Sequence, residues 1–286
     1  MKPLLKWTLR ILGGFVVIIA LFFVFIYTKS NSVMSRTYTF REVPVLADTD
    51  SALLARGEHL TRIGCRGCHG DSLQGRMFAD DAAFGRIRAP GLGAAVRGKT
   101  DGEIAGYFRH GVRKDGSSPL FMPPSGMWHL SDYDLAAIVE YLRTLPAAEE
   151  PAAPRSYGPI GRALVAFGAI KPATAMMDTL APRVGDDSTY RTTRRGEYLA
   201  RVVCASCHGA NLLGETGTKS PALATALGYS LPELTNLLRT GTPRAPETKL
   251  LLMKEVALSD LKNMTDDEIA AVHEYLSKLP ASGVAK

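Results

Sequence analysis

The chain has 286 residues, of which 46% are hydrophobic and 22% are charged, a composition that excludes a wholly disordered protein and allows about two domains. Its formal net charge is +6, yet six basic residues precede the first acidic residue, Glu42. Without those six, 28 of the 34 basic residues remain, which equals the number of acidic residues, 28. The excess positive charge therefore belongs to the N-terminal segment, and the neutral remainder argues against a nucleic-acid partner.

The N-terminal segment contains an unbroken uncharged run from Ile11 to Tyr27. A run of this length can cross a bilayer as a helix, and it has no polar face to suit a buried core helix. A cleaved signal peptide would have a shorter apolar region and small residues at its cleavage site, whereas this run passes into Tyr27-Thr28-Lys29-Ser30. We therefore expect residues 1–28 to form an uncleaved, single-pass membrane anchor. Residues 29–50, with Pro44 among them, are expected to form a polar tether.

The pattern Cys-x-x-Cys-His occurs twice, and the two copies use all four cysteines of the chain. Its members are Cys65, Cys68 and His69 in the first copy and Cys204, Cys207 and His208 in the second. Two thiols one helical turn apart can each bond to a vinyl group of a porphyrin, and the histidine that follows can ligate the iron. A bare Cys-x-x-Cys would also fit zinc or dithiol redox chemistry, but the histidine in both copies favours haem. The motifs predict two covalently attached haem c groups, with His69 and His208 as proximal iron ligands.

The sequence around the motifs is also repeated. Arg-Gly-Glu-His-Leu at 56–60 corresponds to Arg-Gly-Glu-Tyr-Leu at 195–199, and residues 103–111 correspond to residues 233–241. Each copy ends in a helix that starts at a capping residue, Ser131 or Thr265, with an acidic residue three positions later. The repeat predicts an all-α fold of two tandem domains, residues 51–147 and 191–281, each a separate packing unit around its own haem.

Residues 148–190 between the two domains are expected to be a linker with one short helix. The linker is apolar from Ile160 to Ile170, but Arg162 and the short length argue against a second membrane span. We expect this helix to pack against one domain or against the interface between them, with Met176 and Met177 filling gaps there.

The distal iron ligands have to be chosen among methionines, because a thioether is a suitable sixth ligand for haem iron. The candidates are Met77, Met122 and Met127 in the first domain and Met253 and Met264 in the second. The offset between the two copies is 130 at Arg109/Arg239 and 134 at Ser131/Thr265, so an equivalent pair between these positions should fall within that range. Met122 and Met253 are 131 apart, whereas Met127 and Met264 are 137 apart. We therefore predict Met122 and Met253 as the distal ligands and keep His129 as a spare ligand.

Each half of the chain resembles a class I cytochrome c domain on the strength of these motifs. The tandem is similar to the di-haem, membrane-anchored cytochromes of bacteria. It also resembles the cytochrome subunits of membrane-bound alcohol and aldehyde dehydrogenases, which usually carry three haem motifs where this chain has two. The resemblance implies that the carbonyl groups of Pro90 and Pro221 accept hydrogen bonds from the proximal histidines.

The predicted function is electron transfer by a carrier that is not an enzyme by itself. Haem attachment takes place outside the cytoplasm, so we expect the anchor in the bacterial cytoplasmic membrane and the haem domains in the periplasm. The expected partners are redox proteins: a membrane dehydrogenase, a quinol-oxidising complex, a terminal oxidase or a soluble cytochrome. Two alternatives stay open, a di-haem peroxidase-like enzyme with an open distal position and a subunit whose haems only stabilise a respiratory complex.

Overall fold

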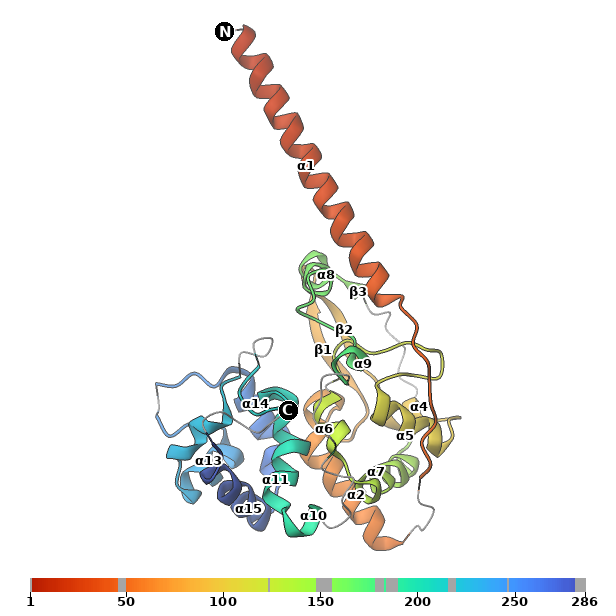
Figure 1. Ribbon diagram of the computed structural model, residues 1–286, viewed down its shortest axis with the longest axis vertical. Helices are drawn as coiled ribbons and strands as arrows, with labels where there is room; N and C mark the ends of the chain where they lie inside the picture. Colours follow the sequence, from red (N-terminus) through yellow and green to blue (C-terminus); the bar gives the residue numbers. More distant parts are fainter. Residues whose placement is uncertain are drawn as a thin grey trace.

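The computed structural model describes residues 2–45, 50–122, 124–147, 156–177, 183, 190–215, 220–245 and 247–280. The fold is mostly helical, as predicted, with two helical domains beside one another at the foot of a long N-terminal helix (Figure 1).

Helix α1, Lys2–Met34, is long and apolar enough to cross a membrane, and its apolar stretch is almost entirely exposed. It continues past residue 28, where the sequence suggested that the tether begins. The segment after it runs along the first domain, with Tyr38 N donating to Gly116 O (2.9 Å) and Val43 N donating to Gly102 O (3.2 Å). This segment is therefore attached to the domain surface.

Six helices lie in the described part of the first domain. They are α2 (Ser51–Gly64), α3 (Arg66–His69), α4 (Leu92–Val96), α5 (Asp101–His110), α6 (Pro124–His129) and α7 (Asp132–Thr144). Helices α2 and α7 cross at Gly57, where an added Cβ would lie 1.9 Å from the carbonyl oxygen of Ala137. Ser131 caps α7 by accepting from Asp134 N. The capped helix α7 thus closes the domain against the helix that leads to the first motif.

The second domain repeats this arrangement. Its helical elements are α10 (Tyr190–Thr193), α11 (Arg195–Leu199), the π-helix η2 (Ala200–Cys204), α12 (Ala205–His208), the 3₁₀-helix η3 (Leu223–Gly228), α13 (Leu231–Thr240), α14 (Leu251–Ser259), the 3₁₀-helix η4 (Leu261–Asn263) and α15 (Asp266–Ser277). Gly196 meets Ala271 O as Gly57 meets Ala137 O, at 2.0 Å for an added Cβ. The capping box of Thr265 and Glu268 starts α15.

A small antiparallel sheet, which is absent from the predicted all-α fold, is inserted in the first domain. Its strands are β1 (Arg76–Asp81), β2 (Gly85–Ala89) and β3 (Ser156–Tyr157), in the order β1-β2-β3. The hairpin occupies the longer of the two connections, because His69 and Pro90 are 21 residues apart and His208 and Pro221 only 13.

The expected short helix in the linker is α8, Pro159–Ala166, and its main partner is α1. Arg162 donates to Ser30 Oγ (3.0 Å) and Asn31 Oδ1 (2.8 Å). Figure 1 shows α8 beside the lower end of α1, next to the hairpin. Helix α9, Ala173–Met177, lies against α6 with Met177 buried.

The two domains share one continuous hydrophobic core, so the expectation of separate packing units is wrong. Met127 of the first domain and Leu199 and Ala205 of the second belong to the same cluster of buried side chains. Helix α6 contacts η2 and α12, and α14 contacts α3. Each domain thus packs against the motif segment of the other.

Candidate functional site

The first motif lies on a single helical turn at the end of α2. His69 N donates to Cys65 O (2.9 Å), and Gly70, with φ +86°, turns the chain away directly afterwards. Burial raises the pKa of the Cys65 thiol to about 12 and also raises the pKa of Cys68. Such thiols are poor thiolates, whereas zinc binding and dithiol redox chemistry need the thiolate. The environment of the pair is therefore unfavourable for dithiol redox chemistry, which needs a lowered thiol pKa.

Both motif histidines have their Nδ1 atoms at a proline carbonyl. The distance is 2.8 Å from His69 to Pro90 O and 2.7 Å from His208 to Pro221 O. The carbonyl can only accept, so Nδ1 donates and Nε2 keeps its lone pair for a metal. Burial lowers the pKa of both imidazoles, although the hydrogen bond to the carbonyl opposes this shift. Both rings are thus held in the neutral form that ligates iron.

A pair of strained residues sets the position of these prolines. Leu73 and Leu212 have left-handed backbones, with φ of +58° and +61°, although both side chains are buried. The carbonyl of each accepts from the residue two positions after the proline, Leu92 N (2.8 Å) in the first domain and Leu223 N (2.9 Å) in the second. The same strained turn therefore places the acceptor for each histidine.

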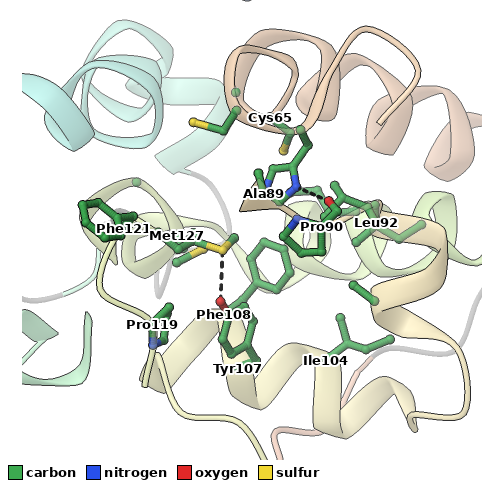
Figure 2. Close-up of a pocket in the computed structure, with 18 of the residues that line it drawn as sticks. Cys65, Ala89, Pro90, Leu92, Ile104, Tyr107, Phe108, Pro119, Phe121 and Met127 are labelled. Carbon is green, nitrogen blue, oxygen red and sulfur yellow. Dashed lines mark hydrogen bonds between the residues drawn. The ribbon is translucent and has the colours of Figure 1, made fainter. Parts of the chain in front are cut away.

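A cavity of about 450 Å³ opens in front of the first motif, within the size range of cofactor sites. Figure 2 shows Cys65 and Pro90 on one side of it and Ile104, Tyr107 and Phe108 on the other. Four basic side chains also line it, those of Arg88, Lys99, Arg113 and Lys114. This lining fits a covalently bound haem. Its walls are apolar, two thiols lie beside an imidazole, methionine can supply a thioether ligand, and the basic side chains can pair with the haem propionates. The residues that would hold it here are Cys65, Cys68, His69 and one methionine.

Two of the three candidate thioethers, Met122 and Met127, line this cavity. Met122 Sδ accepts a hydrogen bond from Tyr107 Oη (3.1 Å), and Met127 is buried on α6. Sequence reasoning missed Tyr107, because the equivalent residue of the repeat is Leu237 and no pattern marks the position.

In the second domain Met253 lies half-buried in the first turn of α14, packed against the core. Met264 is buried directly before the capping residue Thr265. The spare histidine His129 is fully buried, and burial lowers its pKa to about 3, with Arg201 and Arg183 adding to the shift.

Residues 52–142 match the family described as cytochrome c oxidase, cbb3-type, subunit III, and residues 194–280 match the cytochrome c family. The chain consists of two cytochrome c domains in tandem behind an apolar helix. Such domains imply covalently bound haem c, and two domains are consistent with two haems. The predicted family, fold class and haem chemistry are thereby confirmed at this level.

Three relatives have names that refer to a dehydrogenase. The thiosulfate dehydrogenase electron acceptor of Stutzerimonas stutzeri (strain A1501) is 27% identical over 82% of this chain and 87% of its own length. The fructose dehydrogenase cytochrome subunit of Gluconobacter japonicus is 29% identical over 52% of this chain. The cytochrome c subunit of the quinone alcohol dehydrogenase of Gluconobacter oxydans (strain 621H) is 25% identical over 82% of it. The chain spans only 29% and 56% of the lengths of the last two.

The two cytochrome c domains meet through a pair of equivalent polar contacts. His59 Nε2 lies 2.8 Å from Glu268 Oε2 of the other domain, and Tyr198 Oη donates to Asp134 Oδ2 (2.8 Å). His59 and Tyr198 occupy the same position of the repeat, and so do Asp134 and Glu268, each three residues after a helix cap. The repeat does not mark His59, because the other copy has tyrosine at this position. The sequence did carry a signal for this contact: histidine and tyrosine can both donate a hydrogen bond, and Glu268 and Asp134 at the equivalent partner positions are both acidic.

The second motif forms part of the wall of the first cavity. Val202, Val203 and Ser206 of the second cytochrome c domain line that cavity, and Gly126 N donates to Ser206 Oγ (3.2 Å). Reciprocally, Gly67 N, inside the first motif, donates to Asp260 of the second domain (3.0 Å). The two haem attachment segments therefore adjoin across the domain interface.

Proposed function

We propose that this protein relays single electrons between redox partners at the periplasmic face of a bacterial cytoplasmic membrane, through one haem c in each domain. Bound haem supplies the one-electron chemistry. The observation that supports a relay is the shared wall, because Val202, Val203 and Ser206 beside the second attachment site also line the first cavity. The chain itself supplies the attachment thiols, the oriented imidazoles of His69 and His208, and an apolar shell.

Four further residues belong to this proposal. Met122 and Met253 would be the distal ligands, and the carbonyl groups of Pro90 and Pro221 would orient the proximal ones. The domain boundaries from the sequence, 51–147 and 191–281, are kept as the extents of the two haem-binding units.

The proposed electron donor is a dehydrogenase. All three relatives carry names that connect them with a dehydrogenase, although the enzymes differ. Helix α1 would hold the chain at the membrane where such a donor, or a respiratory acceptor, is found. A dehydrogenase purified with the tagged full-length chain should reduce both haems when its own substrate is added. Isolation of the chain without any redox protein, under mild detergent, would contradict this partner class.

The haem count and the two rival functions can be tested on the same preparation. Mass spectrometry of the denatured chain should show two haem increments, and one or none would refute the proposal. A thioether ligand on each iron should keep cyanide from binding rapidly and leave hydrogen peroxide unreduced. Rapid cyanide binding with peroxide turnover would favour a peroxidase. Substrate-driven reduction in the complex that leaves the haems of this chain oxidised would favour a structural subunit.

A further inference from the structure

The linker helix α8 presents large apolar side chains to the exterior beside the apolar helix α1. Ile160 at its start is 54% exposed, and Phe167 at its end is 62% exposed. Phe167 stacks on Phe22 of α1, with ring centroids 6.4 Å apart, and lies equally close to Phe25. The exposed apolar face of α8 is thus continuous with the exposed apolar face of α1.

The level of this contact along α1 indicates what covers it. Lys29 is the first charged residue after the apolar run, so it marks where the helix leaves the hydrocarbon. At 1.5 Å per residue, Phe25 and Phe22 lie about 6 and 10 Å further into the bilayer. Helices that lie in the plane of a membrane surface bury their apolar faces about 5–10 Å deep. Phe167, in contact with both phenylalanines, would therefore lie at that depth.

The one charged residue of α8 fits the same level. The guanidinium of Arg162 lies 4.1 Å from the centre of the Tyr27 ring and donates to Ser30 and Asn31, all close to Lys29. Arginine and tyrosine are both suited to the headgroup layer, because each has an apolar body and a polar end. Arg162 would thus stay at the lipid headgroups while Ile160 and Phe167 reach the acyl chains.

We propose that the segment Ile160–Ile170 is a second membrane contact, which lies in the lipid interface beside the anchor. This proposal rests on the proposed role of α1 as a membrane span. A chain turn supports it at the C-terminal end of α8, where Gly168 (φ +76°) lets Ala169 N and Ile170 N both bond to Leu164 O and so keeps Phe167 at the tip. The contact would hold the first cytochrome c domain close to the bilayer surface.

The test is a depth measurement on the full-length protein in vesicles of phosphatidylcholine and phosphatidylglycerol. Because haem attachment consumes the native thiols, an introduced cysteine is the only free thiol and can take a nitroxide spin label. Phe167→Cys and Ile160→Cys are the test variants. Leu227→Cys, at a 46% exposed position of the second domain, is the aqueous control, and Ile18→Cys, at a 65% exposed position of α1, is the hydrocarbon control. Each labelled protein is first checked for two haems.

Collision rates with oxygen, which concentrates in lipid, are compared with those of a water-soluble nickel chelate. We expect the oxygen-to-nickel ratio at 160 and 167 to exceed that at 227 several-fold and to lie below that at 18. A ratio at 160 and 167 equal to that at 227, with 18 still in lipid, would overturn this inference alone. A low ratio at 18 as well would overturn the membrane anchor. Dipolar broadening between labels at 167, lost on dilution with unlabelled protein, would show a second copy on this face and overturn the lipid contact.

Discussion

At the scale of single residues, two methionines that line the first cavity are candidates for the distal ligand of the first haem. Met122 and Met127 both reach the cavity, and only Met122 agrees with the repeat offset. Met122→Leu should remove the sulfur-to-iron charge-transfer band of one ferric haem and lower its potential, because thioether ligation favours ferrous iron. Met127→Leu conserves volume, so it should leave the band in place at a cost below about 1.5 kcal/mol. Met253→Leu and Met264→Leu form the same matched pair for the second haem, and loss of a band in Met127→Leu alone would reverse the assignment.

Tyr107 gives the first site a feature that the second lacks. Its hydroxyl donates to Met122 Sδ, and Leu237 occupies the equivalent place. A hydrogen bond draws electron density from the sulfur and so disfavours ferric iron more than ferrous iron. Tyr107→Phe should therefore lower the potential of the first haem by about 20–40 mV, which corresponds to about 0.5–1 kcal/mol for one electron. A redox titration that resolves both haems contains its own control, since the second potential should not move.

At the scale of elements, the domains are joined where the helices that lead into the motifs meet the closing helices. The hydroxyl of Tyr198 on α11 is buried, where it donates to Asp134 on α7 and accepts from Ser131 N (3.0 Å). Tyr198→Phe would leave both groups short of a partner and should lower the free energy of unfolding by about 1–3 kcal/mol. Tyr133→Phe, at an exposed position of the same α7, should change it by less than about 0.5 kcal/mol. If denaturant unfolding gives the same loss in the free energy of unfolding for both variants, the buried contact contributes nothing to stability.

The matching contact on α15 predicts a dependence on pH. Burial opposes the charge of Glu268, but hydrogen bonds from His59 and Thr265 N and the charge of Arg56 lower its pKa from 4.5 to about 2. A carboxyl that ionises more readily when folded stabilises the fold above its unfolded pKa and loses that effect as the pH falls. Stability on the order of 3 kcal/mol should therefore be present above about pH 4.5 and disappear toward pH 2.

Acid unfolding of Glu268→Gln tests this expectation. The variant should be less stable at neutral pH and should show a flatter decline between pH 4.5 and 2, because no proton is taken up at this position. Asp267→Asn, on the exposed side of the same first turn, is the control and should keep the slope of the wild type. An unchanged slope in Glu268→Gln would contradict the assignment.

At the scale of the whole molecule, the two cytochrome c domains share one core, and from this we expect them to act as one electron-transfer unit. The attachment segments adjoin, because Gly67 N donates a hydrogen bond to Asp260 and Gly126 N donates one to Ser206 Oγ across the interface. After rapid photoreduction of one haem per chain, the redistribution of the electron should be first order and independent of protein concentration. Chains inactivated at the second site by His208→Ala should lose this phase. A rate proportional to concentration would instead show that electrons pass between chains.

The sequence by itself was enough for the local chemistry. The spacing of Cys65, Cys68 and His69, and its recurrence at 204–208, predicted the haem family because the ligands of such a site are neighbours in the chain. The apolar run of α1 and the caps at Ser131 and Thr265 are likewise local patterns, and the helices begin where they predict. The internal repeat added the two-domain architecture.

Only the tertiary structure decided how the two halves and the linker meet. The contact between Tyr198 and Asp134 joins residues 64 positions apart, and that between His59 and Glu268 joins residues 209 apart. No periodic pattern encodes such pairs, and an alignment of the two copies hides them because a histidine in one copy replaces a tyrosine in the other. The packing of α8 on α1 escaped prediction for the same reason, since an apolar segment shows that it must be covered and does not show by what. Those partners are selected by shape and burial in the folded chain.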